Sequence, residues 1–427
     1  MQSYLLLLII MIVFFVFVEK QEQSGFFWTA LMFAAFYALV TAFEQSVVAA
    51  ALLAGALSMV GIYSFILIEN HFAPQNILFR LISDFDRYSH NFIDDAFMKV
   101  LRLASSFVKP TIKIQNGLYN KRYHSLKNAV NKAQWKMVYE TINSKPNQRA
   151  FLIACLTDEN FKPAHYEKWI AQEPDNALAY ILYGNAMASA AWDVRGSGTA
   201  DMIPISRFET FWEQLMLAQE AFYKAISLDK TDPEPFHSLI TVGMGLQQEN
   251  NTLWEHFVQI IKRDRNHYFG HQSMLTALTA KWGGNGEEVF HFARRTVKNL
   301  PKGDALYGLI PAAHIEQWLY YSMTDDDDAH NQYFRLDENL NEINVAFDAY
   351  YNGISNQPDE IDYCVLNIFA FCFYQSGELD KTRQLLDIIG DKATDYPWDY
   401  CDGPFLAHVD TSYTYSRICQ SLGVSKK

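Results

Sequence analysis

A serine flanked by two glycines is the first arrangement in this 427-residue chain that suggests chemistry. Ser197 stands between Gly196 and Gly198 and follows Arg195. A serine nucleophile on a tight turn has the pattern G-x-S-x-G and follows a strand, whereas this serine ends a helical pattern and opens a loop. Glycine suits a helix end that needs a positive φ. We interpret the segment as a loop or helix cap. A contact with an anion or partner, and a hydrolase that uses Ser197, stay open as alternatives.

Two histidines at helical spacing are the second arrangement. His267 and His271 would lie on one face of a helix, and His291 follows twenty residues later. Zinc needs a third or fourth protein ligand, and no glutamate stands beside either histidine as in H-E-x-x-H. Because the chain holds 12 histidines, one pair at this spacing is expected by chance. We expect no metal site and no cofactor.

A glycine-rich turn, Gly283–Gly286, is similar to a phosphate-binding loop only in its glycine content. It lacks the Lys-Ser/Thr pair of a P-loop, and no strand precedes it. Asn285 as an N-cap, with Glu287 and Glu288 in the first helical turn, accounts for the composition better. The pattern therefore predicts a turn between two helices.

Four consecutive acids, Asp325–Asp328, form the fourth arrangement. Like charges repel and favour an exposed loop. The spacing is not that of an EF-hand, because no D-x-D-x-D-G series with a later glutamate is present. We predict a solvated loop, with a docking point for a basic partner or weak calcium binding as the alternatives.

The composition favours a well-packed helical protein. Half of the residues are hydrophobic and 15% are aromatic, while only 20 glycines and 13 prolines are present. We expect most aromatic side chains in the core and some along a concave peptide groove. The five cysteines form no C-x-x-C pair, so we expect reduced thiols and no zinc ribbon. They are Cys155, Cys364, Cys372, Cys401 and Cys419.

The net charge of −13 is unevenly distributed. Residues 1–79 carry 1 basic and 4 acidic residues, residues 80–149 carry 13 and 5, and residues 150–427 carry 21 and 39. A basic stretch after an apolar N-terminus would face anionic lipid headgroups. The acidic remainder argues against nucleic-acid binding, which needs a basic face.

Three apolar runs without charges open the chain, at 4–18, 25–43 and 46–68. Since about 20 helical residues cross a bilayer, residues 1–72 predict a transmembrane segment with two or three spans. The first run is either a retained span or a cleaved signal. Small residues at helical spacing in the third run would let helices approach closely, within the chain or in a homo-oligomer.

The positions of basic residues predict an orientation for these spans. Lys20 lies between the first two runs, and Arg80 and Arg87 follow the third. Cytoplasmic loops carry an excess of such residues. We therefore expect a multi-pass protein of a bacterial inner membrane, with its C-terminal domain in the cytoplasm.

Residues 73–146 are predicted to be basic and helical. Two of their apolar stripes stop at Pro110 and Pro146, and Lys121, Arg122 and Lys127 occupy polar positions. The segment is either an amphipathic connector against the membrane or the first layers of the following domain.

Regular helix breaks mark residues 147–422. The intervals from Pro233 to Asn266 and from Asn266 to Pro301 are 33 and 35 residues, near the period of a tetratricopeptide (TPR) unit. The outer intervals, 174–233 and 301–358, are 59 and 57 residues, room for one repeat plus an insertion. Gly377–Asp380 matches the turn between the two helices of such a unit. The sequence predicts an all-α, TPR-like α-solenoid.

Two short motifs extend this comparison. Lys281-Trp282-Gly283-Gly284 is followed by Phe292-Ala293-Arg294, and Ala191–Gly198 lies upstream. In this order they resemble a segment of an uncharacterised bacterial family with a TPR-like helical domain, over roughly residues 120–320. The resemblance implies an architecture and no activity.

These patterns predict a membrane-anchored, non-enzymatic scaffold that contacts membrane lipid and binds a protein partner. The alternative is an immunity or regulatory protein that masks a cognate toxin or envelope enzyme. The candidate partner-binding residues are Trp192, Asp193, Arg195, Lys281, Trp282, Asp325, Asp326, Asp327 and Asp328.

Overall fold

A computed structural model describes residues 109–159, 161–196, 203–324, 326–401 and 410–424. The chain divides into two compact units, Met1–Lys109 and Pro110–Lys427. Only the second is described here, apart from Lys109. Its described residues form helices and turns and no strand, which confirms the all-α prediction for this part of the chain.

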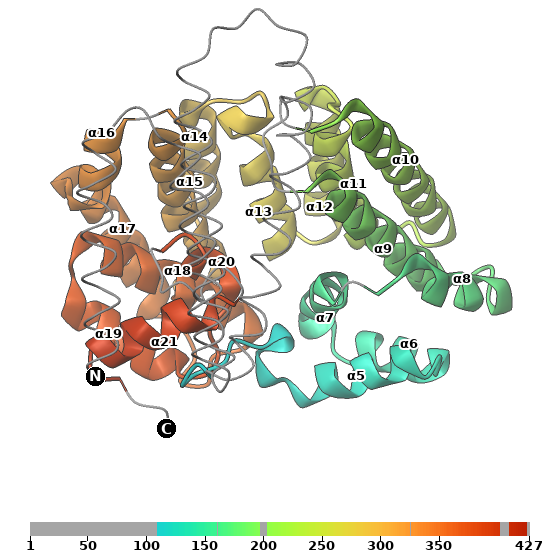
Figure 1. The fold of residues 1–427 in the computed structure, drawn as a ribbon, viewed down its shortest axis with the longest axis horizontal. Helices are drawn as coiled ribbons and strands as arrows, with labels where there is room; N and C mark the ends of the chain where they lie inside the picture. The colour runs from blue at the N-terminus through green and yellow to red at the C-terminus, as the bar shows by residue number, and fades with distance from the viewer. Residues whose placement is uncertain (1–108, 160, 197–202, 325, 402–409, 425–427) are drawn as a thin grey trace, which may run out of the picture. The chain divides into compact units, whose positions relative to one another are not determined.

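The α-helices follow one another across the unit in chain order (Figure 1). Their bounds are α5 Lys121–Asn131, α6 Trp135–Asn143, α7 Pro146–Asp158, α8 Pro163–Gln172, α9 Ala177–Arg195, α10 Ile205–Leu228, α11 Glu234–Gly245, α12 Asn250–Arg263, α13 Tyr268–Ala277, α14 Gly286–Val297, α15 Leu309–Met323, α16 Asp327–Gln332, α17 Asp337–Tyr351, α18 Glu360–Ser376, α19 Leu379–Ile389, α20 Asp395–Trp398 and α21 Ser412–Ser421. Short 3-10 turns are η1 Asn116–Tyr119, η3 Ala280–Trp282, η4 Ala305–Gly308 and η5 Tyr333–Arg335.

Side-chain caps start several of these helices at the predicted breaks. Asn176 caps α9, and Asn285 accepts a hydrogen bond from the backbone N–H of Glu288 at 3.0 Å. Asp359 begins α18 with a capping box, in which Asp362 bonds back to the Asp359 N–H. Gly377 ends the same helix with φ 86°, a left-handed conformation that glycine adopts at no steric cost. Local chemistry therefore sets these boundaries.

The helices pack in successive pairs, α9 with α10, α11 with α12 and α18 with α19. The first residues of α11 and α13 are 34 positions apart, close to the predicted period. The long interval before Pro233 holds no extra repeat, because α9 and α10 themselves are 19 and 24 residues long. The interval after Pro301 does contain an insertion, α16 with η5.

Two apolar clusters form the core. The N-terminal cluster joins η1 and α5–α9, and it includes Leu126, Val138 and Trp169, all fully buried. Residues of α5 and α6 thus pack into the same core as α8. The described residues of 110–146 therefore belong to the second compact unit and contribute to its core. The larger cluster extends from α9 to the C-terminus.

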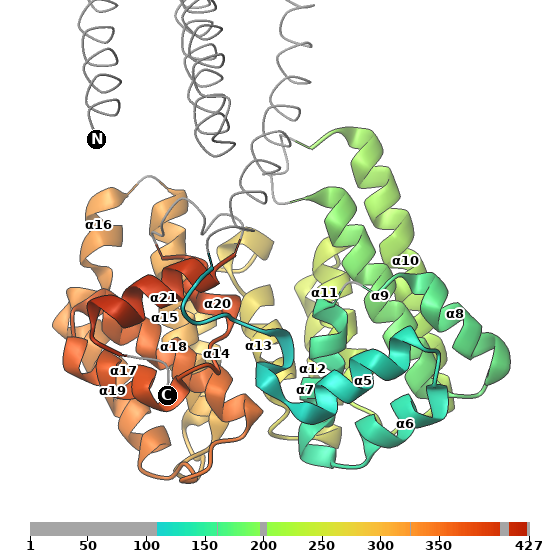
Figure 2. The same ribbon diagram turned by 60° about the horizontal axis from the view of Figure 1, so that its bottom comes forward.

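The two ends of the described unit contact each other. The backbone N–H of Ile112 donates to the hydroxyl of Ser416 on α21, and that hydroxyl donates to the Ile112 carbonyl, both at 2.9 Å. Figure 2 shows the segment that leads into α5 passing beside α21. Gln148 on α7 donates to Glu360 on α18 at 3.1 Å. Repeats of an open solenoid contact only their neighbours. Here, contacts between first and last helices close the array on itself.

No helix in the described ranges is both long enough and apolar enough to cross a membrane. The longest, α10, carries five charged side chains, which are costly in hydrocarbon. This finding overturns the predicted localisation as a multi-pass inner-membrane protein with a cytoplasmic domain. The predicted spans at 4–18, 25–43 and 46–68, and the oligomer contact in the third, lie outside the described residues.

Candidate functional site

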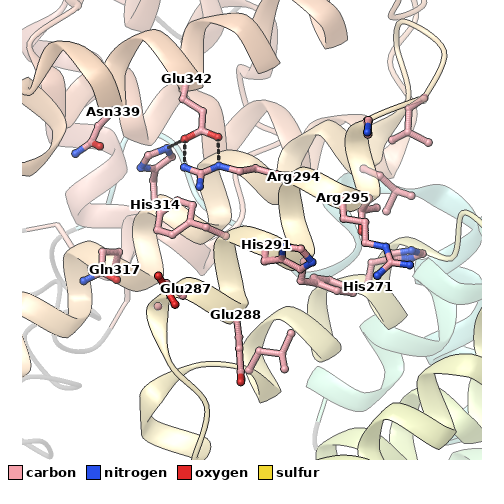
Figure 3. Close-up of a pocket in the computed structure, with 18 of the residues that line it drawn as sticks. His271, Glu287, Glu288, His291, Arg294, Arg295, His314, Gln317, Asn339 and Glu342 are labelled. Carbon is pink, nitrogen blue, oxygen red and sulfur yellow. Dashed lines mark hydrogen bonds and ion pairs between the residues drawn. The ribbon is translucent and has the colours of Figure 1, made fainter.

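A broad open groove of about 2470 Å³ runs along α14 (Figure 3). Helix α14 forms its floor, α12 forms one wall, and α15 with α16, η5 and α17 forms the other. Small-molecule sites are usually about 300–1,000 Å³ and enclosed. We call this feature the α14 groove, and its size suits a macromolecular segment.

A chain of four polar side chains joins the floor to one wall. Arg294 on α14 donates two hydrogen bonds of 2.7 Å to the two carboxylate oxygens of Glu342 on α17. The same carboxylate lies 3.4 Å from Nε2 of His314 on α15. Nδ1 of His314 is 2.9 Å from the hydroxyl of Tyr333. Figure 3 shows the arginine, glutamate and histidine pointing toward one another.

The electrostatics of this chain keep its histidine neutral. The two hydrogen bonds from Arg294, followed by the contact with His314, lower the pKa of Glu342 to about 2. Burial lowers the pKa of His314, which is 1% exposed. Because Arg294 already neutralises the carboxylate, the imidazole gains little from a second proton.

A carboxylate, an imidazole and a hydroxyl in series can activate a nucleophile. In this series the hydroxyl belongs to Tyr333, which is 5% exposed, and burial raises its pKa. The phenol therefore stays protonated and donates to His314. The arrangement fixes α14, α15 and α17 relative to one another.

A second, deeper network lies beside the ends of α11 and α13. Glu234 is 2% exposed and accepts a hydrogen bond of 3.1 Å from Nε2 of His267. Nδ1 of His267 accepts the Gly270 N–H at 2.9 Å, which makes Nε2 the protonated nitrogen. Arg149 on α7 pairs through both of its terminal nitrogens with Asp232. The network links α7, α11 and α13.

The two carboxylates of this network respond differently to burial. Burial by itself raises the pKa of Glu234, but His267 and then His237 outweigh it and hold that pKa well below its usual range. Burial also raises the pKa of Asp232, and Arg149 only partly offsets the effect. Burial lowers the pKa of His267, but Glu234 reverses the direction.

The two histidines at helical spacing do not converge on a common point. Nδ1 of His271 lies 2.9 Å from the backbone carbonyl of His267, to which it donates. The side chain of His267 is committed to Glu234 and Gly270. Within the described residues, no three His, Cys, Asp or Glu side chains gather as a metal site would require.

The structure brings together two motifs that the sequence set 90 residues apart. The rings of Trp192 and Trp282 pack edge to face with centroids 5.8 Å apart. The guanidinium of Arg195 lies 5.6 Å from the Trp192 ring centroid. Lys281 pairs with Glu316 at 2.8 Å. Asp193 is exposed beside them, and none of these six residues lines the α14 groove.

The acidic run begins a helix. Asp325 lies outside the described residues, and Asp326 caps α16 by accepting the Ala329 N–H at 3.1 Å. Asp327 and Asp328 occupy the first turn, where carboxylates complement the helix dipole. Of the predicted partner-binding residues that the structure describes, Asp328 is the one that lines the α14 groove.

The sequence reasoning missed most groove residues. Trp254 and Val258 on α12 are each 37% exposed and line the groove. Their spacing of four residues predicts instead that both side chains are buried in the core. The pattern of α14 is that of an ordinary amphipathic helix, with His291, Arg294 and Arg295 on its polar face. Helix α12 has apolar residues at more positions than one buried face requires, which indicates that some of them are exposed. The sequence does not show which ones.

Comparisons with known proteins add no relative. No protein-family model matches the chain, and no curated protein matches it. The resemblance to an uncharacterised bacterial family therefore rests on the two short motifs.

Proposed function

We propose that this protein is a non-enzymatic, TPR-like helical-repeat scaffold that binds a protein partner in the α14 groove. The observation that supports it most is the groove itself, with a volume of about 2470 Å³ and a lining supplied by α12, α14, α15, α16 and α17. Helical repeats offer extended surfaces of this kind for other proteins.

The chemistry of the lining also supports a protein partner. Trp254, Val258 and Leu336 expose apolar surface in the groove, at 37%, 37% and 43%. Exposed aromatic and aliphatic side chains beside polar ones are the anchors of protein interfaces. Asparagine and glutamine amides along the same walls, including Asn250, Asn339 and Gln317, can bond to peptide groups.

Preorganisation strengthens such a site. The Arg294–Glu342 pair and the His314–Tyr333 hydrogen bond hold the floor and one wall together without a partner. A groove that is already shaped loses less conformational freedom when it binds. We therefore expect the backbone of the groove to move little on binding.

Site-specific photocrosslinking in the source organism tests the proposal on the full chain. A photoreactive phenylalanine replaces Val258 or His291 in the groove, and Leu217 or Tyr223 on the exposed face of α10 as controls. A further variant at Asp193 tests the surface around Trp192 and Trp282 that the sequence suggested.

We expect one discrete protein adduct from positions 258 and 291 and none of the same mass from 217 and 223. The same adduct from all four positions, or no adduct from the groove, would contradict the proposal. An adduct from position 193 alone would move the partner site to the tryptophan pair.

A further inference from the structure

The charges on the floor of the α14 groove change sign along its length. Glu287 and Glu288 occupy the first turn of α14, and Arg295 and Lys298 occupy its last turn and C-cap. All four side chains line the groove. In Figure 3 the two glutamates lie on one side of His291 and Arg295 lies on the other.

Neighbouring helices add charge of the same sign at the acidic end. Gly286 at the start of α14 approaches Gln317, and the backbone carbonyl of Tyr321, one turn later on α15, accepts the Asp326 N–H. The first turn of α16, with Asp328, therefore lies at the acidic end.

The basic side chains lie at the other end of the groove, near the C-terminus of α14. Gly303, after α14, donates to the carbonyl of Ala349 near the end of α17, so Glu338 at the start of α17 lies toward the acidic end. Asn266 bonds to Asp304 at 2.7 Å, which brings the loop with Arg265 to the basic end. One end of the groove therefore has four carboxylates and the other end has three cations. They are Glu287, Glu288, Asp328 and Glu338, and Arg265, Arg295 and Lys298.

None of these seven side chains forms an ion pair or hydrogen bond with another described residue, in contrast to Arg294 and Glu342 in the middle. Helix dipoles explain acids in first turns and bases in last turns. The dipoles do not explain why the acidic first turns of α14, α16 and α17 lie at one end of the same groove, and the basic residues after α12 and α14 at the other.

Two features of the α12 side indicate what lies between the charged ends. Trp254, Val258 and Ile261 follow one another at i, i+4 and i+7 and line the wall. His271 is 4% exposed and lines the groove, and its Nε2 carries no hydrogen bond from any described residue. Because burial lowers its pKa to about 4, the imidazole is a neutral acceptor at pH 7.

We propose that the α14 groove binds an amphipathic helix of the partner, antiparallel to α14. Such a helix carries acids in its first turn and bases in its last. Antiparallel seating places its acidic end against Arg265, Arg295 and Lys298. Its apolar face meets the Trp254 stripe, in the helix-in-groove mode of recognition. This inference rests on the proposed function above.

The dimensions agree with this occupant. A helix of about 12 residues is about 18 Å long, the length of α14, and with a diameter of about 10 Å it fills about 1,400 Å³. The groove of about 2470 Å³ therefore has room for it and for interfacial water.

Two stapled, fluorescent 16-residue peptides test the inference on the full chain. Both carry leucines at i, i+3, i+4 and i+7 and have the same composition. One has acidic residues first and basic residues last, and the other has the reverse order. Stapling keeps their helicity equal, and a third, unstapled peptide with a central proline tests the need for a helix.

Fluorescence anisotropy at 20 mM and 300 mM salt should show at least tenfold tighter binding of the acid-first peptide at low salt. The preference should shrink at high salt because ions screen exposed charges. In a variant with Arg265→Glu, Arg295→Glu, Lys298→Glu, Glu287→Lys, Glu288→Lys and Glu338→Lys, the preference should reverse. Circular dichroism checks that this variant is folded.

The outcomes separate the two proposals. If both stapled peptides bind equally and the variant does not reverse the order, the polarity is wrong and the scaffold stands. Equal binding of the proline peptide would exclude a helical occupant. If no peptide binds to the wild type, this inference fails, and crosslinking at positions 258 and 291 then decides whether the groove binds protein at all.

Discussion

Two carboxylates in the described part of the chain, Glu342 and Glu234, contact histidines and differ in their nearest cation. Glu342 at the groove takes two hydrogen bonds from Arg294, and burial lowers the pKa of its histidine partner, His314. Glu234 lies deeper, and the nearest guanidinium nitrogen, on Arg149, is 3.9 Å away because that arginine is paired with Asp232. Its histidine partner, His267, has a raised pKa.

The difference shows that the cation nearest a carboxylate decides whether the pKa of the neighbouring histidine rises or falls. Where a permanent guanidinium already serves the carboxylate, the histidine stays neutral. Where the guanidinium is committed elsewhere, the carboxylate raises the pKa of the imidazole that donates to it.

The largest expected effect comes from removing the deeper carboxylate. Glu234→Ala leaves His267 without its acceptor and Arg149 facing Asp232 alone, and breaking a buried pair costs about 3–5 kcal/mol. Urea unfolding at pH 7 measures the loss. The matched control, Glu287→Ala on the exposed face of α14, should change stability by less than about 0.5 kcal/mol. Equal losses from both variants would contradict the comparison.

The second effect is a loss of stability in acid through His271, a histidine with no carboxylate partner. Burial lowers its folded pKa to about 4, against about 6.5 unfolded. The unfolded state therefore binds more protons between these values, and stability that is complete above pH 6.5 falls by about 3 kcal/mol by pH 4.

Unfolding free energies between pH 7 and pH 4 test the role of His271. His271→Asn places an amide nitrogen where Nδ1 donates, and should flatten the profile in this window. Glu234, whose folded pKa is depressed, supplies stability that is present above about pH 4.3 and lost below it. A profile unchanged by His271→Asn would show that another group titrates.

A smaller effect is expected at the groove. Glu342→Gln removes the charged acceptor of Arg294, whose side chain is 57% exposed, so solvent screens much of the interaction. We expect a loss of about 1 kcal/mol in urea unfolding at pH 7, at least threefold less than for Glu234→Ala. A larger loss than at Glu234 would reverse the comparison.

The smallest effect should come from Arg294→Lys. A lysine keeps the charge but cannot bond to both carboxylate oxygens of Glu342 at once. We expect a loss of about 0.5 kcal/mol and a rise in the pKa of the Glu342 carboxyl, which NMR titration of its side-chain carbon measures. An unchanged pKa would show that charge alone holds it low.

The fold was predictable where its cause is local. The breaks before α9, α11 and α18 follow from an asparagine, a proline and a capping aspartate, and the end of α18 follows from Gly377. Local reasoning failed at the acidic run. Charge repulsion predicted a loop at 325–328, but Asp326 caps α16 and Asp327 and Asp328 form its first turn. The predicted localisation failed because no described helix combines the length and apolarity that a span needs.

The candidate site depended on long-range packing. Residues 192 and 282 were predicted as separate contacts, and the structure packs their rings together. Groove residues come from segments between 250 and 342, and each segment alone has the pattern of an ordinary amphipathic helix. Which apolar positions stay exposed is decided by the neighbouring helix pair, so periodicity cannot reveal it.

The sequence by itself determined the all-α character, several helix boundaries and a repeat near 34 residues, because 3.6-residue periodicity and helix caps act within a few residues. Only the tertiary structure decided which charges are paired, which acids and bases share a groove, and that residues near 112 and 416 bond to each other. These contacts join positions up to 304 residues apart, and their energies arise from burial that exists only after the helices have packed.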